Sequence, residues 1–148
     1  MQMTLDFAGQ YDLQNTAVTH PNTYQVVRLD MRKVLVYPNG TLNQQPIAKR
    51  VANLTNAQLP NGAAFARPAD SKNLLVADIY RGLIWNVDVH SGKVGVTLND
   101  TATKGQGTSG PSVAGVNGIK VFNGSIYWST LLSSMCCLCI LKGSSIYG

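Results

Sequence analysis

The chain has 148 residues, of which 45% are apolar and 13% are charged, and its net charge at neutral pH is +5. This length can bury one hydrophobic core, and the ordinary composition argues against a disordered tail or a coiled coil. The chain contains 14 glycines and no glutamate, and Asn, Thr and Val are frequent. These features favour strands joined by turns over helices, so we predict an all-β fold.

The basic residues are spread along the sequence, with adjacent pairs only at Arg32-Lys33 and Lys49-Arg50. A nucleic-acid surface usually has a basic cluster, so no nucleic-acid partner is predicted. No apolar run approaches the roughly 20 residues of a membrane-spanning helix, and no signal peptide is visible. Localisation stays open, because secretion would agree with four N-glycosylation motifs, which begin at Asn39, Asn53, Asn99 and Asn123.

Residues 1–52 are predicted to contribute part of one sheet. A first strand is expected around Leu5–Ala8, a second over Tyr24–Asp30 and a third over Gln45–Val51. The turn at Pro38-Asn39-Gly40 marks an insertion between the last two. In a four-stranded unit these would be the second, third and fourth strands.

Residues 53–98 are predicted to form one complete unit, a four-stranded antiparallel meander over Leu59–Leu98. Two short apolar runs, Ala63–Ala66 and Asn73–Asp78, come before two segments in which apolar and polar residues alternate. Alternation places every second side chain on one face of a strand. Four apolar side chains are expected to pack between neighbouring sheets: Trp85, Val87, Val94 and Val96.

Residues 99–116 are rich in Thr, Gly and Ser and are predicted to form a long surface loop. Residues 117–130 follow as the start of another unit. There, Gly118–Phe122 and Ser125–Trp128 flank Asn123-Gly124, which is a strong β-hairpin signal.

Residues 131–148 differ from the rest of the chain. The segment Leu131–Leu141 is apolar without clear alternation and contains all three cysteines. A structural zinc site needs about four ligands, so we do not predict one here. We expect this segment to pair poorly with the preceding sheet or to fill a strand position in the wrong register.

Two similar turns, Leu59-Pro60-Asn61-Gly62 and Gly115-Val116-Asn117-Gly118, each lead into an apolar strand-like run. Their asparagines lie 56 residues apart. The return of a strand-entry turn after roughly 40–50 residues is typical of β-propeller blades. Propellers place the beginnings of their inner strands around a central channel, where an Asn oxygen can bind a hard metal ion. We therefore predict that Asn61 and Asn117 lie side by side as candidate metal ligands. A purely structural role stays open, because Asn-Gly turns are common for backbone reasons alone.

With the runs Leu74–Asp78 and Ile84–Asp88, these turns resemble the gluconolactonase/regucalcin-like six-bladed β-propellers, and in particular their fungal members. The resemblance extends from about residue 5 to Trp128. It implies an incomplete propeller over residues 1–130, with about two to two and a half blades of four-stranded meanders. A truncated or misjoined product would account for the change of pattern over residues 131–148.

In that family a divalent ion, usually calcium, lies in the central channel and supports lactone hydrolysis. Asn61 matches one ligand, whereas Asn117 stands where the family has an Asp that serves as ligand and general base. An amide cannot accept a proton near neutral pH, and no glutamate is present to match the family's Glu ligand. The resemblance therefore implies metal-dependent hydrolysis of a lactone or ester that is impaired or absent here, with weak calcium binding. The alternative is a non-catalytic propeller that binds a small molecule or a protein partner.

Other polar candidates have structural explanations, and no catalytic residue is assigned. Asp78 follows a buried strand and is expected to brace a turn, and Asp88 is expected at a strand-end turn. His90 belongs to an outer hairpin away from any channel. Ser109 and Ser112 lie in the predicted loop without a paired base, which gives a serine hydrolase no support.

Overall fold

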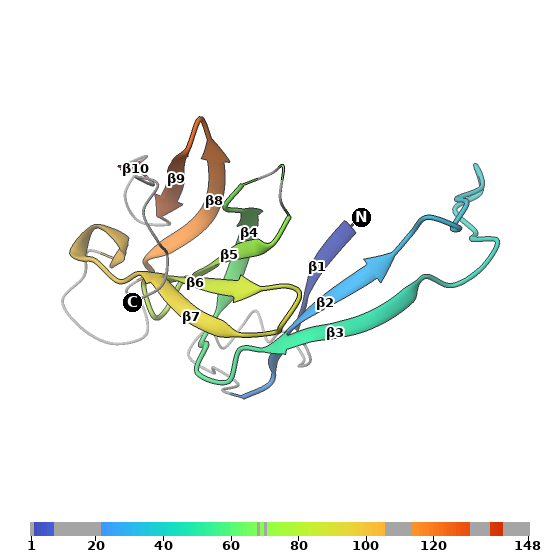
Figure 1. The fold of residues 1–148 in the computed structure, drawn as a ribbon, viewed down its shortest axis with the longest axis horizontal. Coiled ribbons are helices and arrows are strands. Elements are labelled where there is room, and N and C mark those ends of the chain that lie inside the picture. Colours follow the sequence, from blue (N-terminus) through green and yellow to red (C-terminus); the bar gives the residue numbers. More distant parts are fainter. Residues whose placement is uncertain are drawn as a thin grey trace.

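The computed structural model describes residues 2–7, 22–67, 69, 71–105, 114–130 and 137–140. Over these ranges the chain forms ten strands in three antiparallel sheets (Figure 1). The helical content of the same ranges is one 3-10 turn, η1 (Thr101–Thr103). The predicted all-β class is therefore confirmed.

The first sheet has the strand order β1-β2-β3 and contains the three strands predicted before residue 53. Their bounds are β1 (Gln2–Phe7), β2 (Tyr24–Asp30) and β3 (Ile47–Asn53). The middle strand has the predicted bounds, and the third begins two residues later than Gln45. Antiparallel pairing places Arg28 opposite Lys49 and Val27 opposite Arg50.

The central sheet is the predicted four-stranded meander, with the order β4-β5-β6-β7. Its strands are β4 (Pro60–Phe65), β5 (Asn73–Asp78), β6 (Leu83–Asp88) and β7 (Val94–Leu98). Each strand pairs antiparallel with the next one along the chain, as expected when short turns join consecutive strands.

The third sheet has the order β10-β9-β8, with β8 (Val116–Phe122), β9 (Ser125–Thr130) and β10 (Cys137–Ile140). Asn123 and Gly124 join β8 to β9 with φ angles of +48° and +72°. Positive φ at both central residues is the requirement of a type I′ turn, so the predicted hairpin is confirmed. In the predicted loop over residues 99–116, the structure places η1, and residues 106–113 lie outside the described ranges.

Strand β10 corrects one expectation for the cysteine-containing segment. Cys137–Ile140 pairs with Ser125–Trp128 in an unbroken antiparallel register. Poor pairing is therefore wrong for these four residues, whereas residues 131–136 and 141 lie outside the described ranges. The physical reason is that the edge of β9 offers unpaired backbone groups, which bond any extended segment whether or not its side chains alternate.

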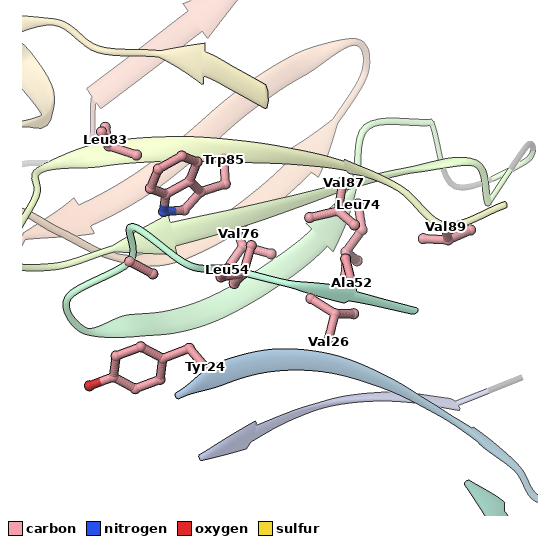
Figure 2. Close-up of a cluster of buried hydrophobic side chains, with 11 residues drawn as sticks. Tyr24, Val26, Ala52, Leu54, Leu74, Val76, Leu83, Trp85, Val87 and Val89 are labelled. Carbon is pink, nitrogen blue, oxygen red and sulfur yellow. The ribbon is translucent and has the colours of Figure 1, made fainter. Parts of the chain in front are cut away.

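The central sheet buries both faces. One face packs against β2 and β3. Figure 2 shows the side chains of this core, which come from both sheets and include Val26, Ala52 and Val76. The other face packs against β8 and β9. Strand β6 contributes to both cores, since Trp85 and Val87 belong to the first and Ile84 to the second. The alternation predicted for this strand is therefore confirmed.

Val96 is an exception among the four side chains expected between sheets. Trp85 and Val87 are buried and Val94 packs against the same core, but Val96 is 50% exposed. Val96 pairs directly with Trp85 and so shares its face. It lies on β7, the edge strand, where the neighbouring sheet does not cover it. The expectation that Val96 is packed is therefore wrong.

This difference predicts unequal effects of the same substitution. Val87→Ala removes a fully buried side chain and is expected to lower the free energy of unfolding by about 2 kcal/mol. Val96→Ala, the matched control, is expected to change it by no more than roughly 0.5 kcal/mol. Urea unfolding of both variants measures the two values, and equal losses would contradict the packing of this face.

Candidate functional site

The two similar segments lie next to each other, because β4 packs beside β8. Their prediction as turns before a strand is wrong for the Asn-Gly residues, which belong to the strands themselves. Asn61 and Asn117 are each the second residue of their strand. The Nδ2 atom of Asn61 donates a hydrogen bond of 2.5 Å to the Oδ1 atom of Asn117. The predicted proximity of these two side chains is therefore confirmed.

Both asparagines lie at the same kind of irregularity. The β4–β5 register shifts between Pro60 and Ala63, and the β8–β9 register shifts between Val116 and Ile119. A shift of this kind inserts unpaired residues into a strand and redirects their side chains. Asn61 and Asn117 therefore occupy equivalent positions. Their Asn-Gly sequences inside strands were the available signal for these bulges, although the sequence prediction used them only as turns.

Gly62 permits the close approach of the two strands. Its φ angle is +71°, and a Cβ atom built there would lie 2.8 Å from the carbonyl oxygen of Asn117. A side chain at this position would be strained by its backbone conformation and would collide with backbone atoms of β8. The hydrogen bond between the two asparagines thus depends on glycine at residue 62.

Ile79 connects the segments that lead into both turns. Its N–H donates to the carbonyl oxygen of Leu59 at 3.0 Å, and its carbonyl oxygen accepts from the N–H of Gly115 at 2.9 Å. Leu59 lies two residues before Asn61, and Gly115 lies two residues before Asn117. The backbone of one residue thus fixes where both asparagine-bearing strands begin.

Asp78 is fully buried and anchors the backbone directly before β4. Its carboxylate accepts hydrogen bonds from the backbone N–H groups of Gln58 and Leu59, each at 3.0 Å. It also accepts from the N–H of Arg81 at 3.3 Å and from the indole Nε1 of Trp85 at 3.0 Å. These four donors support the bracing role predicted for Asp78.

The asparagine pair alone supplies too few ligands for a strong calcium site. Calcium takes roughly 6–8 oxygen ligands, and two amides supply two neutral oxygens. The Asn117 oxygen faces the Asn61 Nδ2 atom, so the two oxygens do not converge in this arrangement. In the part of the chain that the structure describes, no group of three or more His, Cys, Asp or Glu side chains could hold a metal ion. At most, the pair would therefore bind calcium weakly.

The remaining candidates lie elsewhere. Asp88 accepts hydrogen bonds from the backbone N–H groups of His90 and Ser91 at 2.9 and 3.1 Å, as expected of a strand-end turn residue. These bonds, with that from Ser91 the stronger influence, hold the pKa of the Asp88 carboxyl below its usual value. His90 is exposed in the turn between β6 and β7. Ser109 and Ser112 lie outside the described ranges.

No protein-family model and no curated protein matches this sequence. None of the residues placed in the structure belongs to a helix long and apolar enough to cross a membrane.

Proposed function

We propose that the three sheets are successive blades of a six-bladed β-propeller of the gluconolactonase/regucalcin type. Three features support this proposal. The first strand of the central sheet, β4, lies beside β8 and, over a shorter stretch, beside β1. Apolar cores fill both spaces between sheets. Equivalent bulges place Asn61 and Asn117 at the start of neighbouring first strands, as blades around one channel would.

In this proposal the asparagine pair is the binding centre of the propeller, and the observation that carries it is the hydrogen bond between the two side chains. The activity of the parent fold is metal-dependent hydrolysis of a lactone or ester. This chain retains weak ligand binding and has little or no hydrolysis. The reason is that neither amide can act as a general base. Each amide still offers a donor and an acceptor to a carbonyl or hydroxyl group of a small molecule.

Calcium titration and a lactone-hydrolysis assay test this proposal together. We expect calorimetry to give a dissociation constant no tighter than about 10⁻⁴–10⁻³ M, the range of low-affinity sites. The double variant Asn61→Ala, Asn117→Ala should lose this binding. Asn117→Asp adds a charged oxygen ligand and a base, so we expect roughly tenfold tighter calcium binding and a gain in hydrolysis.

Asn123→Asp is the matched control, because it makes the same change before a glycine in an exposed hairpin turn. It should leave calcium affinity and hydrolysis unchanged. Micromolar calcium binding that survives the double alanine substitution would place any metal elsewhere and reject this centre.

A non-catalytic propeller is the second candidate function. The specific observation in its favour is that the Asn117 oxygen already accepts a hydrogen bond from Asn61. This hydrogen bond orients both amides as a polar surface for a small molecule or a protein partner. Lactone binding without hydrolysis, even in Asn117→Asp, would favour this alternative over the lactonase.

A further inference from the structure

The connection between β2 and β3 forms an arm that extends away from the three sheets (Figure 1). We define the arm as residues 28–50, so that it includes the adjoining strand ends. Among the residues whose burial the structure describes, eight large hydrophobic side chains are exposed, and five of them belong to the arm: Leu35, Val36, Tyr37, Leu42 and Ile47. Leu35, Val36 and Ile47 are 62%, 65% and 73% exposed. Such a concentration of exposed apolar surface usually marks an interaction site.

The tip of the arm, residues 31–43, is folded by its own hydrogen bonds. The Oδ1 atom of Asn43 accepts from the N–H of Leu35 at 2.7 Å, and the Nδ2 atom of Asn43 donates to the carbonyl oxygen of Lys33 at 3.2 Å. Val36 and Leu42 form an isolated β-bridge. Backbone N–H groups along the tip are bonded within it, namely those of Val34, Leu35, Tyr37, Gly40, Thr41 and Asn43. The tip therefore holds its shape without help from the core, while its apolar side chains remain outside.

The arm also carries most of the net charge. The adjacent pairs Arg32-Lys33 and Lys49-Arg50, which lie apart in the sequence, belong to the two sides of this one hairpin. With Arg28, they give the arm five of the chain's twelve basic residues, against one of its seven aspartates. Five positive charges and one negative charge make +4, out of a net +5 for the whole chain. Within the arm, the β2–β3 register places Arg28 directly opposite Lys49.

Asp30, the one acidic residue of the arm, is paired with a basic residue of the same arm. Its carboxylate accepts hydrogen bonds from the Arg32 side chain, from Nε at 2.9 Å and from a terminal nitrogen at 2.5 Å. These bonds hold the pKa of the Asp30 carboxyl well below its usual range. Asp30 is therefore paired with Arg32 and is also influenced by the charge of Arg28, which leaves Lys33, Lys49 and Arg50 for a negatively charged partner.

The exposed apolar side chains of the tip and the basic residues of the same arm together favour a lipid surface over another protein. Leu35, Val36 and Tyr37 are consecutive and all three are exposed, so alternation along the extended backbone puts apolar side chains on both sides of the arm. One protein surface covers one side of a loop, whereas an interfacial lipid layer surrounds it. A second copy of the chain is disfavoured, because two arms of charge +4 repel each other.

We propose that the arm docks on an anionic lipid surface. The apolar tip enters the region between headgroups and acyl chains, and Lys33, Lys49 and Arg50 bind the headgroups. Internal hydrogen bonding of the tip lowers the cost of bringing its backbone into an apolar medium. Tyr37 suits the interface because its ring is apolar and its hydroxyl is polar. Binding of this kind lies on the surface and needs no membrane-spanning segment.

Vesicle co-sedimentation of the full chain tests the proposal. The probes are phosphatidylcholine vesicles with and without about one quarter phosphatidylserine. We expect binding to the anionic vesicles alone, and weaker binding as salt rises. The triple variant Lys33→Gln, Lys49→Gln, Arg50→Gln should bind at least roughly tenfold more weakly. Leu35→Ser with Val36→Ser should reduce binding severalfold. In Tyr37→Trp, the emission of the new indole should shift to the blue on anionic vesicles.

Phe122→Ser is the control, because Phe122 is 65% exposed at the end of β8 and lies outside the arm. It should bind the vesicles as the unmodified chain does. No binding, equal binding to both vesicle types, or equal losses in Phe122→Ser and the arm variants would overturn the proposal. Poly-glutamate that binds as tightly as the anionic vesicles, with no loss in Leu35→Ser, Val36→Ser, would also overturn it and assign the arm to an acidic protein.

Discussion

Replacement of Asp78 by alanine is expected to lower the free energy of unfolding by at least about 3 kcal/mol. The carboxylate is fully buried and accepts from three backbone N–H groups and the indole of Trp85. Alanine supplies no acceptor, so these donors would lose their partners together. Buried donors without acceptors cost more than the hydrogen bonds themselves contribute.

Two further variants separate this effect from the loss of any aspartate. Asp78→Asn keeps the shape of the side chain and one acceptor oxygen. It should therefore lower the free energy of unfolding less than Asp78→Ala does. Asp88→Ala removes a carboxylate that bonds the exposed N–H groups of His90 and Ser91. Water can replace those bonds, and the expected loss is about 1 kcal/mol or less. Urea unfolding at neutral pH gives all three values, and a loss below about 1 kcal/mol in Asp78→Ala would contradict the bracing role.

The sequence was sufficient to predict the central sheet, because one-face alternation around Trp85 and Val87 leaves few other folds for a segment with short turns. It also predicted that Asn61 and Asn117 would be neighbours, because equivalent turns in a repeated unit occupy equivalent places. Both predictions depend on local pattern, which the chain carries in consecutive residues.

The features that sequence reasoning missed depend on pairing between distant residues. The exposure of Val96 follows from its place on an edge strand, which alternation does not reveal. The basic arm arises because the β2–β3 register places Arg28 opposite Lys49. The role of Ile79 follows from hydrogen bonds to two residues that are far apart in the chain, Leu59 and Gly115. None of these relations has a signature in consecutive residues.

The close approach of β4 and β8 gives the second large expected effect. Gly62→Ala introduces a Cβ atom at a φ angle of +71°, where it would lie 2.8 Å from the carbonyl oxygen of Asn117. Left-handed backbone costs a non-glycine residue about 1–2 kcal/mol, and overpacking costs about 1–3 kcal/mol more. Because the colliding atom belongs to the backbone, no side-chain rotation can relieve the contact. We therefore expect a total loss of roughly 3 kcal/mol in the free energy of unfolding.

Gly124→Ala isolates the contact from the backbone strain. Gly124 has a similar φ angle of +72°, but a Cβ atom there would meet nothing within 4 Å. The free energy of unfolding of Gly124→Ala should fall only by the cost of left-handed backbone, about 1–2 kcal/mol. The difference between the two variants, measured by urea unfolding, is therefore the cost of separating β4 from β8. If the two losses are equal, the strands do not approach at Gly62, and the hydrogen bond between Asn61 and Asn117 has no basis. If they differ as expected, Gly62→Ala should also weaken the calcium binding proposed for the asparagine pair, whereas Gly124→Ala should preserve it.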